Sequence, residues 1–375
     1  MAKVTSNAKT DSHHGRRQGG QPYAFNPYEI AVCGYSNSGK TVLARRLIES
    51  LSGQHRVGYV KQAHDFEMDR PGKDSFEAAA AGATDVFVAT PEKTASLTQR
   101  GTDKFHQQRQ LIDADCVVVE GLKHSELPKM VVVDAENRIR RDDLELQNVL
   151  AWIEPGQRDD IAAVRRLVDG HFAAVTESRP LYGLVLAGGR STRMQQDKAA
   201  LDYHGKPQVR HAGELLGSHC AKTFVSVRGE QSADAAVHDL PQICDRHLGF
   251  GPMGGILSAM HEHPEAAWLV LACDLPFVDD SLLTHLLANR QPMQPATAYR
   301  STSDSFPEPL CAIWEPKSIF ALLHFMGLGY KCPRKVLINT EIRLLEQPFK
   351  HALDNANRPE EYAEIKKRIS QETDQ

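Results

Sequence analysis

Short apolar runs separated by polar, glycine-containing segments recur along the whole chain. In the first half these runs occupy residues 28–33, 57–61, 85–89, 116–120 and 131–134, and in the second half residues 181–187, 223–227, 242–245 and 268–274. Runs of this length, bounded by turn residues, are typical of buried strands in a parallel sheet. The pattern therefore predicts an α/β fold, in which strands alternate with helices.

The helices expected between these strands follow from the spacing of apolar side chains. Residues 41–51 have helical spacing at Val42, Leu43, Leu47 and Leu51. We also predict helices over residues 76–81 and 161–167, a helix that ends at Leu216 and a helix that begins at Ile256.

The chain is longer than one hydrophobic core usually organises, with 375 residues. The pattern becomes mixed and polar over residues 171–180, so we place a domain boundary at about residue 175. We expect two doubly wound domains, the first over residues 28–174 and the second over residues 175–375. Residues 1–27 are polar and lack periodicity, which predicts a disordered tail.

Composition narrows the class of protein. Apolar residues make up 41% and charged residues 25%, as is ordinary for a soluble globular protein. The net charge of −4 gives no global basic surface and disfavours a nucleic-acid partner. The seven cysteines form no C-x-x-C pair and several lie in apolar runs, which indicates buried thiols in a reducing cytosol. There is no run of about 18 apolar residues and no apolar region near the N-terminus, so we expect no membrane span, no secretion and a cytoplasmic location.

A complete phosphate-binding motif follows the first predicted strand. Residues 34–41 match G-x-x-x-x-G-K-[ST], and the strand before them and the helix after them are the context that this motif requires. In such a loop the amides surround the β-phosphate, the lysine reaches the β/γ oxygens and the hydroxyl binds Mg²⁺. The predicted nucleotide-binding residues are Gly34, Tyr35, Ser36, Asn37, Ser38, Gly39, Lys40 and Thr41.

The apolar run over residues 116–119 ends at an acid, Glu120. A buried strand would deliver this carboxylate beside the phosphate loop, so Glu120 is the expected partner of Thr41 on the Mg²⁺ side. The alternative is an acid that caps a helix. Residues 62–75 are polar and fit either a switch-type loop or a solvated loop. The chain has no Asn-Lys-x-Asp tetrapeptide, so the motifs of the first domain do not indicate a base preference.

A second phosphate cradle is predicted where residues 181–187 lead into Gly188 and Gly189. Paired glycines let backbone amides approach an anion, a following helix would add its positive end, and Arg190, Arg193 and Lys198 supply positive charge. The alternative is an ordinary strand-to-helix turn beside a solvated basic helix.

Three further strands of the second half also end at charged side chains, Arg228, Asp245 and Asp274. Ligands collect at the carboxyl ends of strands in open α/β sheets, so these residues and Gly188 could share one cleft. A purely structural role in a turn remains the alternative for each of the three.

The second half resembles MobA, the molybdenum cofactor guanylyltransferases, within the nucleotidyltransferases that use a Leu-Ala-Gly-Gly…Arg-Met…Asp-Lys loop. The residues that carry this resemblance are Leu186, Ala187, Gly188 and Gly189, Arg193 and Met194, Asp197 and Lys198, and residues 205–207, 251–255 and 273–276. Two positions depart from the family, which commonly has Gly where this chain has Gln195 and Asn near the position of Arg228.

The first half resembles MobB, the P-loop partner of that enzyme. Residues 34–41, Lys61 with His64, residues 70–75 and residues 119–121 carry this second resemblance. The two resemblances together cover about residues 28–370 and indicate a natural fusion of MobB and MobA. They imply an N-terminal P-loop NTPase-like domain over residues 28–174 and a C-terminal Rossmann-like nucleotidyltransferase domain over residues 175–375.

The resemblance implies transfer of GMP from GTP to the terminal phosphate of molybdopterin, with Mg²⁺ as cofactor. It implies catalytic roles for Arg193, Lys198 and Asp274, with Asp274 as a metal ligand. The implied GTP-binding residues of the second domain are Leu186, Ala187, Gly188, Gly189, Lys198, Arg228, Asp245 and Asp274. The first domain would bind GTP with Mg²⁺ through Lys40, Thr41 and Glu120 and act as an adapter toward molybdoenzyme apoproteins or chaperones. The alternatives are a cytidylyl or sugar-phosphate transferase, and a non-catalytic cofactor carrier.

Overall fold

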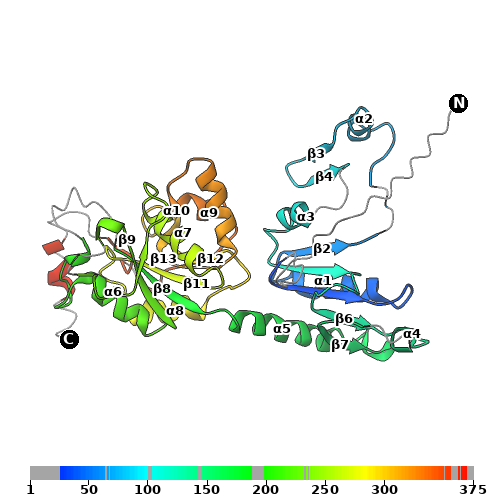
Figure 1. Cartoon of the computed structure of the whole chain (residues 1–375), viewed down its shortest axis with the longest axis horizontal. Coiled ribbons are helices and arrows are strands. Elements are labelled where there is room, and N and C mark those ends of the chain that lie inside the picture. The colour runs from blue at the N-terminus through cyan, green and yellow to red at the C-terminus, as the bar shows by residue number, and fades with distance from the viewer. Residues whose placement is uncertain are drawn as a thin grey trace. The chain divides into compact units, whose positions relative to one another are not determined.

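The computed structural model describes residues 26–63, 66, 68–99, 104–141, 145–187, 198–231, 234, 236–349, 351–355, 362–363 and 365–369. The chain divides into two compact units, Met1–Val168 and Asp169–Gln375, and each is described by itself (Figure 1). Asn26 is buried, and its Nδ2 donates a hydrogen bond of 2.8 Å to the carbonyl oxygen of Ala114. Folded structure is therefore already present at the end of the segment predicted as a tail.

The N-terminal unit is built around a parallel sheet in the strand order β2-β5-β1-β6-β7. Its elements are β1 (Glu29–Cys33), α1 (Lys40–Ser52), β2 (Val57–Lys61), α2 (Asp74–Ala80), β3 (Asp85–Ala89), β4 (Thr94–Thr98), α3 (Lys104–Gln110), β5 (Cys116–Glu120), β6 (Lys129–Val132), α4 (Arg138–Arg141) and β7 (Val149–Ile153). Strands β1 and β5 are buried along their whole length because helices and neighbouring strands enclose them, which explains their continuous apolar runs.

The predicted strand over residues 85–89 exists but does not join the main sheet. It pairs antiparallel with β4 in a separate two-stranded hairpin (Figure 1). An apolar run indicates a strand without indicating its partner, so periodicity could not separate these two outcomes.

Helix α5 (Ile161–Glu177) extends ten residues past the helix predicted over residues 161–167 and crosses from one unit to the other. Most of the segment 171–180, where we expected the pattern to change, belongs to this same helix, which ends at Glu177. The positions of its polar side chains on a helix that is largely exposed explain why they interrupt the apolar periodicity.

The C-terminal unit contains a seven-stranded sheet in the order β10-β9-β8-β11-β13-β12-β14. Its elements are β8 (Leu181–Leu186), α6 (Gln208–Gly217), β9 (Lys222–Val227), β10 (Gln242–Cys244), α7 (Pro252–Glu262), β11 (Ala267–Ala272), α8 (Asp280–Ala288), β12 (Ala296–Arg300), β13 (Pro307–Trp314), α9 (Ser318–Gly327), α10 (Pro333–Ile338) and β14 (Arg343–Leu345). All pairings are parallel except those of β13, which runs antiparallel to both β11 and β12.

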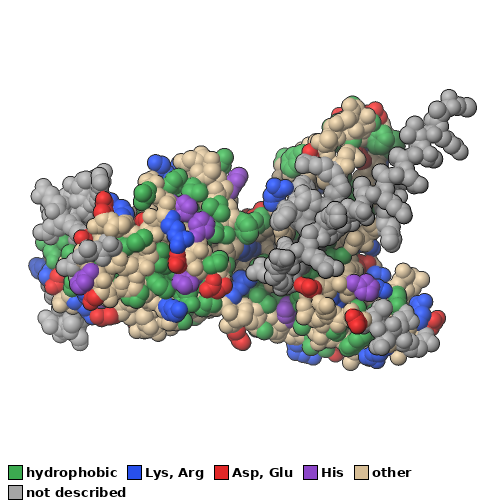
Figure 2. All heavy atoms as spheres, viewed as in Figure 1, with side chains coloured by type: hydrophobic (Ala, Val, Ile, Leu, Met, Phe, Trp, Pro, Cys, Tyr) green, Lys and Arg blue, Asp and Glu red, His purple; other side chains and the backbone are tan. Residues whose placement is uncertain are grey.

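The α/β fold class predicted from the sequence is confirmed in both units. The most apolar predicted run, now β11, is buried at every residue and lies between β8 and β13. Strands β12 to β14 were not predicted, because their residues mix apolar and polar side chains in a sheet that is partly covered. Acidic and basic side chains are interspersed over the face seen in Figure 2.

The expectation that the cysteines are buried holds for four of the seven, Cys33, Cys116, Cys273 and Cys311. It is wrong for Cys244 and Cys332, which are exposed because one ends the edge strand β10 and the other precedes α10. None of the seven, all of which the structure describes, forms a disulfide. Among the described helices, none has the length and apolarity needed to cross a bilayer.

Candidate functional site

The phosphate loop of the N-terminal unit connects β1 to α1 in the arrangement that its motif predicts. Gly39 has φ +91°, a left-handed conformation that favours glycine, directly before the first turn of α1. The carbonyl oxygen of Ser38 accepts a hydrogen bond of 2.7 Å from Nη1 of Arg158, and Lys40 Nζ donates to the carbonyl oxygen of Tyr35 over 3.3 Å. The loop is thus held by contacts from outside it as well as by its own lysine.

A carboxylate stands beside this loop. Strand β5 pairs with β1 so that Glu120 lies opposite Val32, one residue before the end of β1. Glu120 is 2% exposed, and its Oε1 accepts a hydrogen bond of 2.7 Å from the hydroxyl of Thr41. Its Oε2 accepts a second hydrogen bond of 2.7 Å from Tyr59, and Lys61 Nζ lies 3.3 Å from Oε1.

These contacts set the charge state of the site. Burial opposes ionisation of Glu120, but the hydrogen bonds from Tyr59 and Thr41 and the charge of Lys61 together outweigh it and lower the pKa of this carboxyl. Burial and the adjacent Glu120 also raise the pKa of Tyr59. Glu120 is therefore an ionised oxygen donor in contact with the hydroxyl of Thr41, which is the pair of ligand types that suits Mg²⁺. The role of a helix cap, the alternative for Glu120, has no counterpart among its contacts in the described residues.

Four strand ends of the C-terminal unit lie at one edge of its sheet. Strands β8, β9, β10 and β11 are mutually parallel, with Leu186 opposite both Ala272 and Ser226. Asp274 follows β11 by two residues and is half-buried, and the backbone N–H of Cys273 donates to the carbonyl oxygen of Leu186. The start of the predicted Gly-Gly loop and Asp274 are therefore neighbours.

Several predicted residues of this loop fall outside the described part of the chain. Gly188, Gly189 and Arg193 lie there, and of Lys198 the structure describes the backbone, at the start of the 3₁₀ turn Lys198–Ala200, but not the side chain. Their proposed roles stay predictions. Leu186 and Ala187 are described, buried and directly before the loop.

Arg228 and Asp245 follow β9 and β10 at the same edge. Asp245 Oδ1 accepts a hydrogen bond of 2.7 Å from Ser226, while burial raises the pKa of Asp245, partly opposed by that hydrogen bond and by Arg228. Arg228 is held by Gln231 Oε1, at 3.1 Å from its Nε, and by Glu230 at 3.3 Å. The two residues thus lie close enough to interact electrostatically at this edge of the sheet.

Helix α7 approaches this edge very closely. A Cβ on Gly255 would lie 2.4 Å from Ser226 Oγ and 3.0 Å from Leu186 Cδ2. Only glycine allows the first turn of α7 to pack against the ends of β8 and β9, so Gly255 positions the start of this helix at the candidate site.

Replacing Gly255 by Ala is therefore expected to lower the free energy of unfolding by about 1–3 kcal/mol, because the added methyl overpacks this contact. Gly213 is the matched control, since it also lies in a helix and a Cβ there meets nothing within 4 Å. Gly213→Ala should stabilise by about 0.5–1 kcal/mol. Chemical denaturation measures both, and equal effects of the two substitutions would contradict the close-packing argument.

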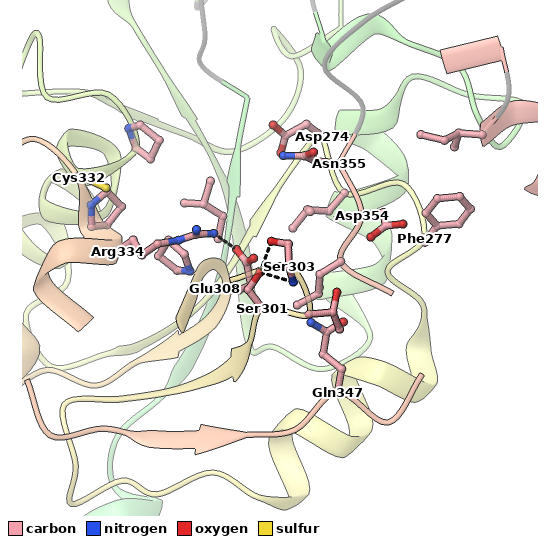
Figure 3. A pocket seen from close by; sticks show the side chains of 18 of the residues that line it. Asp274, Phe277, Ser301, Ser303, Glu308, Cys332, Arg334, Gln347, Asp354 and Asn355 are labelled. Atoms are coloured by element: carbon pink, nitrogen blue, oxygen red, sulfur yellow. Dashed lines mark hydrogen bonds and ion pairs between the residues drawn. The ribbon is translucent and has the colours of Figure 1, made fainter. Parts of the chain in front are cut away.

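A cavity of about 790 Å³ opens beside Asp274 (Figure 3). Polar side chains in its lining are Asp274, Ser301, Thr302, Ser303, Glu308, Gln347, Asp354 and Asn355, and its cations are Lys331, Arg334 and Arg368. Arg334 pairs with Glu308 at 2.6 Å and with Asp304 at 2.8 Å. Lys331 instead lies over the ring of Phe250, 5.7 Å from its centroid, and Arg368 lies over the ring of Phe277, 4.5 Å from its centroid.

His204 connects the segment after the predicted loop to the turn that carries Asp274. Its Nε2 donates a hydrogen bond of 3.0 Å to the carbonyl oxygen of Pro276, and its ring stacks on His211 with centroids 3.8 Å apart. Burial, with the neighbouring His204 and Lys206, lowers the pKa of His211 to about 4.

This pKa predicts how the stability of the C-terminal unit depends on pH. A histidine whose pKa falls on folding binds more protons when unfolded, so its contribution is complete above pH 6.5 and is lost as the pH falls toward about 4. The unfolding temperature should therefore fall as the pH is lowered over this interval. In His211→Asn it should fall less. An unchanged pH slope in the variant would show that other groups cause it.

Sequence reasoning missed the residues that reach the sites from distant segments. Tyr59, Lys61 and Arg158 contact the phosphate-loop site, and Arg334 and Asn355 line the cavity. Of these residues, only Lys61 could have been placed at the site from the sequence. It ends a predicted strand, and ligands bind at the edge of the sheet where parallel strands end.

Two protein families match the chain in the same order as the two units. Residues 29–154 match the family described as "Molybdopterin guanine dinucleotide synthesis protein B", and residues 183–343 match "MobA-like NTP transferase domain". A relative from Nostoc sp., named "Probable molybdenum cofactor guanylyltransferase", is 30% identical over 192 residues, which are 49% of this chain and 90% of the relative. The chain belongs to the MobA-like NTP transferase family. Its C-terminal unit is the MobA-like unit, and its N-terminal unit is MobB-like.

Other relatives match half of the chain or less. A "Molybdenum cofactor biosynthesis bifunctional protein" of Synechocystis sp. is 36% identical over 186 residues, which are 50% of this chain and 54% of the relative. A "Molybdopterin-guanine dinucleotide biosynthesis adapter protein" of Haemophilus influenzae is 36% identical over 109 residues, 28% of this chain and 61% of the relative. The chain thus spans between half and two thirds of the length of these two relatives.

Proposed function

We propose that the MobA-like unit transfers GMP from GTP to the terminal phosphate of molybdopterin, with release of pyrophosphate. The observation that supports this proposal best is the position of Asp274. It borders both the sheet edge where the predicted nucleotide loop begins and the 790 Å³ cavity. A carboxylate between a nucleotide loop and a second binding cavity suits a reaction between two bound substrates.

The cavity has the chemistry expected of the acceptor side. A phosphorylated pterin needs positive charge for its phosphate and hydrogen-bonding groups for its ring edges. Lys331 and Arg368 supply the charge, while Ser301, Gln347 and Asn355 supply donors and acceptors. These residues would orient the acceptor so that its phosphate faces Asp274.

The reaction forms a bond from an acceptor phosphate oxygen to the α-phosphorus of GTP and breaks the bond from that phosphorus to the pyrophosphate oxygen. A phosphate monoester is already ionised near neutral pH, so the chain needs no general base. The proposed work of Arg193 and Lys198 is to neutralise charge on the departing pyrophosphate, and that of Gly188 and Gly189 is to orient the triphosphate.

Mg²⁺ fits both units by the chemistry of their donors. In the MobA-like unit Asp274 would hold it against the α-phosphate, and in the MobB-like unit the contact between Thr41 and Glu120 offers two oxygen ligands. Mg²⁺ usually takes one or two protein carboxylates and completes its shell with water and phosphate oxygens, so few protein ligands are needed at either site. When bound, it would polarise the phosphate oxygens.

The proposed function of the MobB-like unit is to bind GTP and act as an adapter during delivery of the cofactor to molybdoenzyme apoproteins or their chaperones. Its preformed phosphate loop, with Lys40 and the pair of Thr41 and Glu120, supports nucleotide binding.

Nucleotide and acceptor competition tests the proposal. The purified chain is incubated with Mg²⁺ and either the pterin phosphate or a sugar phosphate, together with GTP, CTP or ATP, and pyrophosphate release is measured. We expect release with GTP and the pterin phosphate. Pyrophosphate release only with CTP, or only when the sugar phosphate is the acceptor, would identify one of the related transferases instead. Binding of the pterin phosphate without pyrophosphate release would identify a carrier.

A further inference from the structure

Lys61 lies beside the part of the phosphate-loop site where Mg²⁺ would bind. Strand β2 pairs with β5 so that Lys61 lies directly opposite Glu120, at the edge of the sheet where the phosphate loop begins. Its Nζ lies 3.3 Å from the same Glu120 oxygen that accepts the hydrogen bond of Thr41. Lys61 therefore lies beside the two oxygens assigned to Mg²⁺.

Glu120 already contacts three donor groups in this arrangement. Its Oε2 already accepts from Tyr59 and its Oε1 from Thr41, with Lys61 on the same oxygen. A metal ion that is coordinated by Thr41 and neutralised by Glu120 would repel the ammonium group at this distance. Lys61 is 48% exposed, and a half-exposed ion pair is held weakly, so its flexible side chain can leave Glu120 at little cost.

The terminal phosphate of a bound nucleotide is the nearest destination for the released ammonium group. In P-loop sites Mg²⁺ bridges the β- and γ-phosphates, so the γ-phosphate lies next to the metal and carries the largest local negative charge. Lys40 approaches from the loop itself, whereas Lys61 approaches from the neighbouring strand end.

We propose that Lys61 is a second phosphate-binding cation of this site, which pairs with Glu120 and can turn from it to contact the γ-phosphate of bound GTP. This inference rests on the proposed binding of GTP by the MobB-like unit. It makes Lys61 the residue by which this unit distinguishes GTP from GDP, because only GTP has a γ-phosphate to contact.

The test measures nucleotide affinity with the full chain. Fluorescent analogues of GTP and GDP are titrated in Mg²⁺ into the wild type, Lys61→Gln and Lys40→Ala, and the Lys40→Ala isotherm is subtracted as the contribution of the MobA-like unit. Lys61→Gln should lower the affinity for GTP by about 10-fold or more, as expected for the loss of one charge-assisted contact. It should lower the affinity for GDP by less than about twofold. Lys61→Arg keeps the charge and should restore much of the preference for GTP.

The controls separate the inference from the function on which it rests. Lys93→Gln removes the same charge from the exposed turn between β3 and β4 and should leave both affinities unchanged. If Lys61→Gln lowers the affinities for GTP and GDP equally, Lys61 only supports the structure of the site. If both affinities are unchanged, Lys61 does not contact the nucleotide. Either result overturns the inference alone. Identical isotherms for the wild type and Lys40→Ala would overturn both the inference and nucleotide binding by this unit.

Discussion

Replacing Asp274 by Asn is expected to lower the rate of pterin dinucleotide formation by about 10²-fold or more, the loss seen when one preorganised electrostatic group is removed from a reaction centre. Asp274 follows a fully buried strand and lies where the nucleotide edge meets the cavity. The amide keeps the shape of the side chain but removes the negative charge that would hold Mg²⁺ against the α-phosphate. Initial rates of pyrophosphate release at saturating GTP measure the effect.

Asp280→Asn is the matched control for this substitution. Asp280 lies in the same unit at the start of α8, where its side chain is 70% exposed and contacts His219. Removing its charge should change the rate and the stability very little, because isolated surface charges contribute weakly. Comparable losses in the two variants would exclude a special role for Asp274 and leave it as a residue of a turn.

The second large effect is expected at the phosphate loop. Lys40→Ala removes the ammonium group that the motif aims at the β- and γ-phosphates, so GTP affinity at this site should fall by about 10²-fold. Equilibrium dialysis at a GTP concentration that saturates the wild type should then give about one bound GTP per chain in place of about two, because the sequence predicts a phosphate cradle in each unit.

The stoichiometry makes this prediction specific. Loss of both bound nucleotides in Lys40→Ala would mean that the variant is misfolded, which circular dichroism and the unfolding temperature would reveal. A well-folded variant that keeps the wild-type stoichiometry would contradict nucleotide binding by the MobB-like unit.

Local sequence patterns predicted the parts of the fold that depend on neighbouring residues. The phosphate loop was readable because strand, glycines, lysine and helix follow one another within residues 28–51. Asp274 was identifiable because an unbroken apolar run delivers it to a strand end. The α/β fold class followed from the same alternation in both units.

Contacts between distant segments were not readable in this way. Arg158 reaches Ser38 across 120 residues of sequence, and Tyr59 reaches Glu120 across 61. Periodicity reports whether a segment is half-buried, but it does not report its partner, so the β3–β4 hairpin and the reversed direction of β13 could not be foreseen. The cavity beside Asp274 collects residues from several such segments and was missed for the same reason.

The most direct measurement identifies the nucleotide that the chain attaches to its acceptor. The wild-type chain is incubated with Mg²⁺, molybdopterin and an equimolar mixture of GTP, CTP and ATP, and the pterin product is analysed by mass spectrometry. The account predicts a product heavier by one GMP unit, formed together with pyrophosphate and lost in Asp274→Asn. A product that contains CMP or AMP, or an acceptor that is bound but not modified, would contradict it.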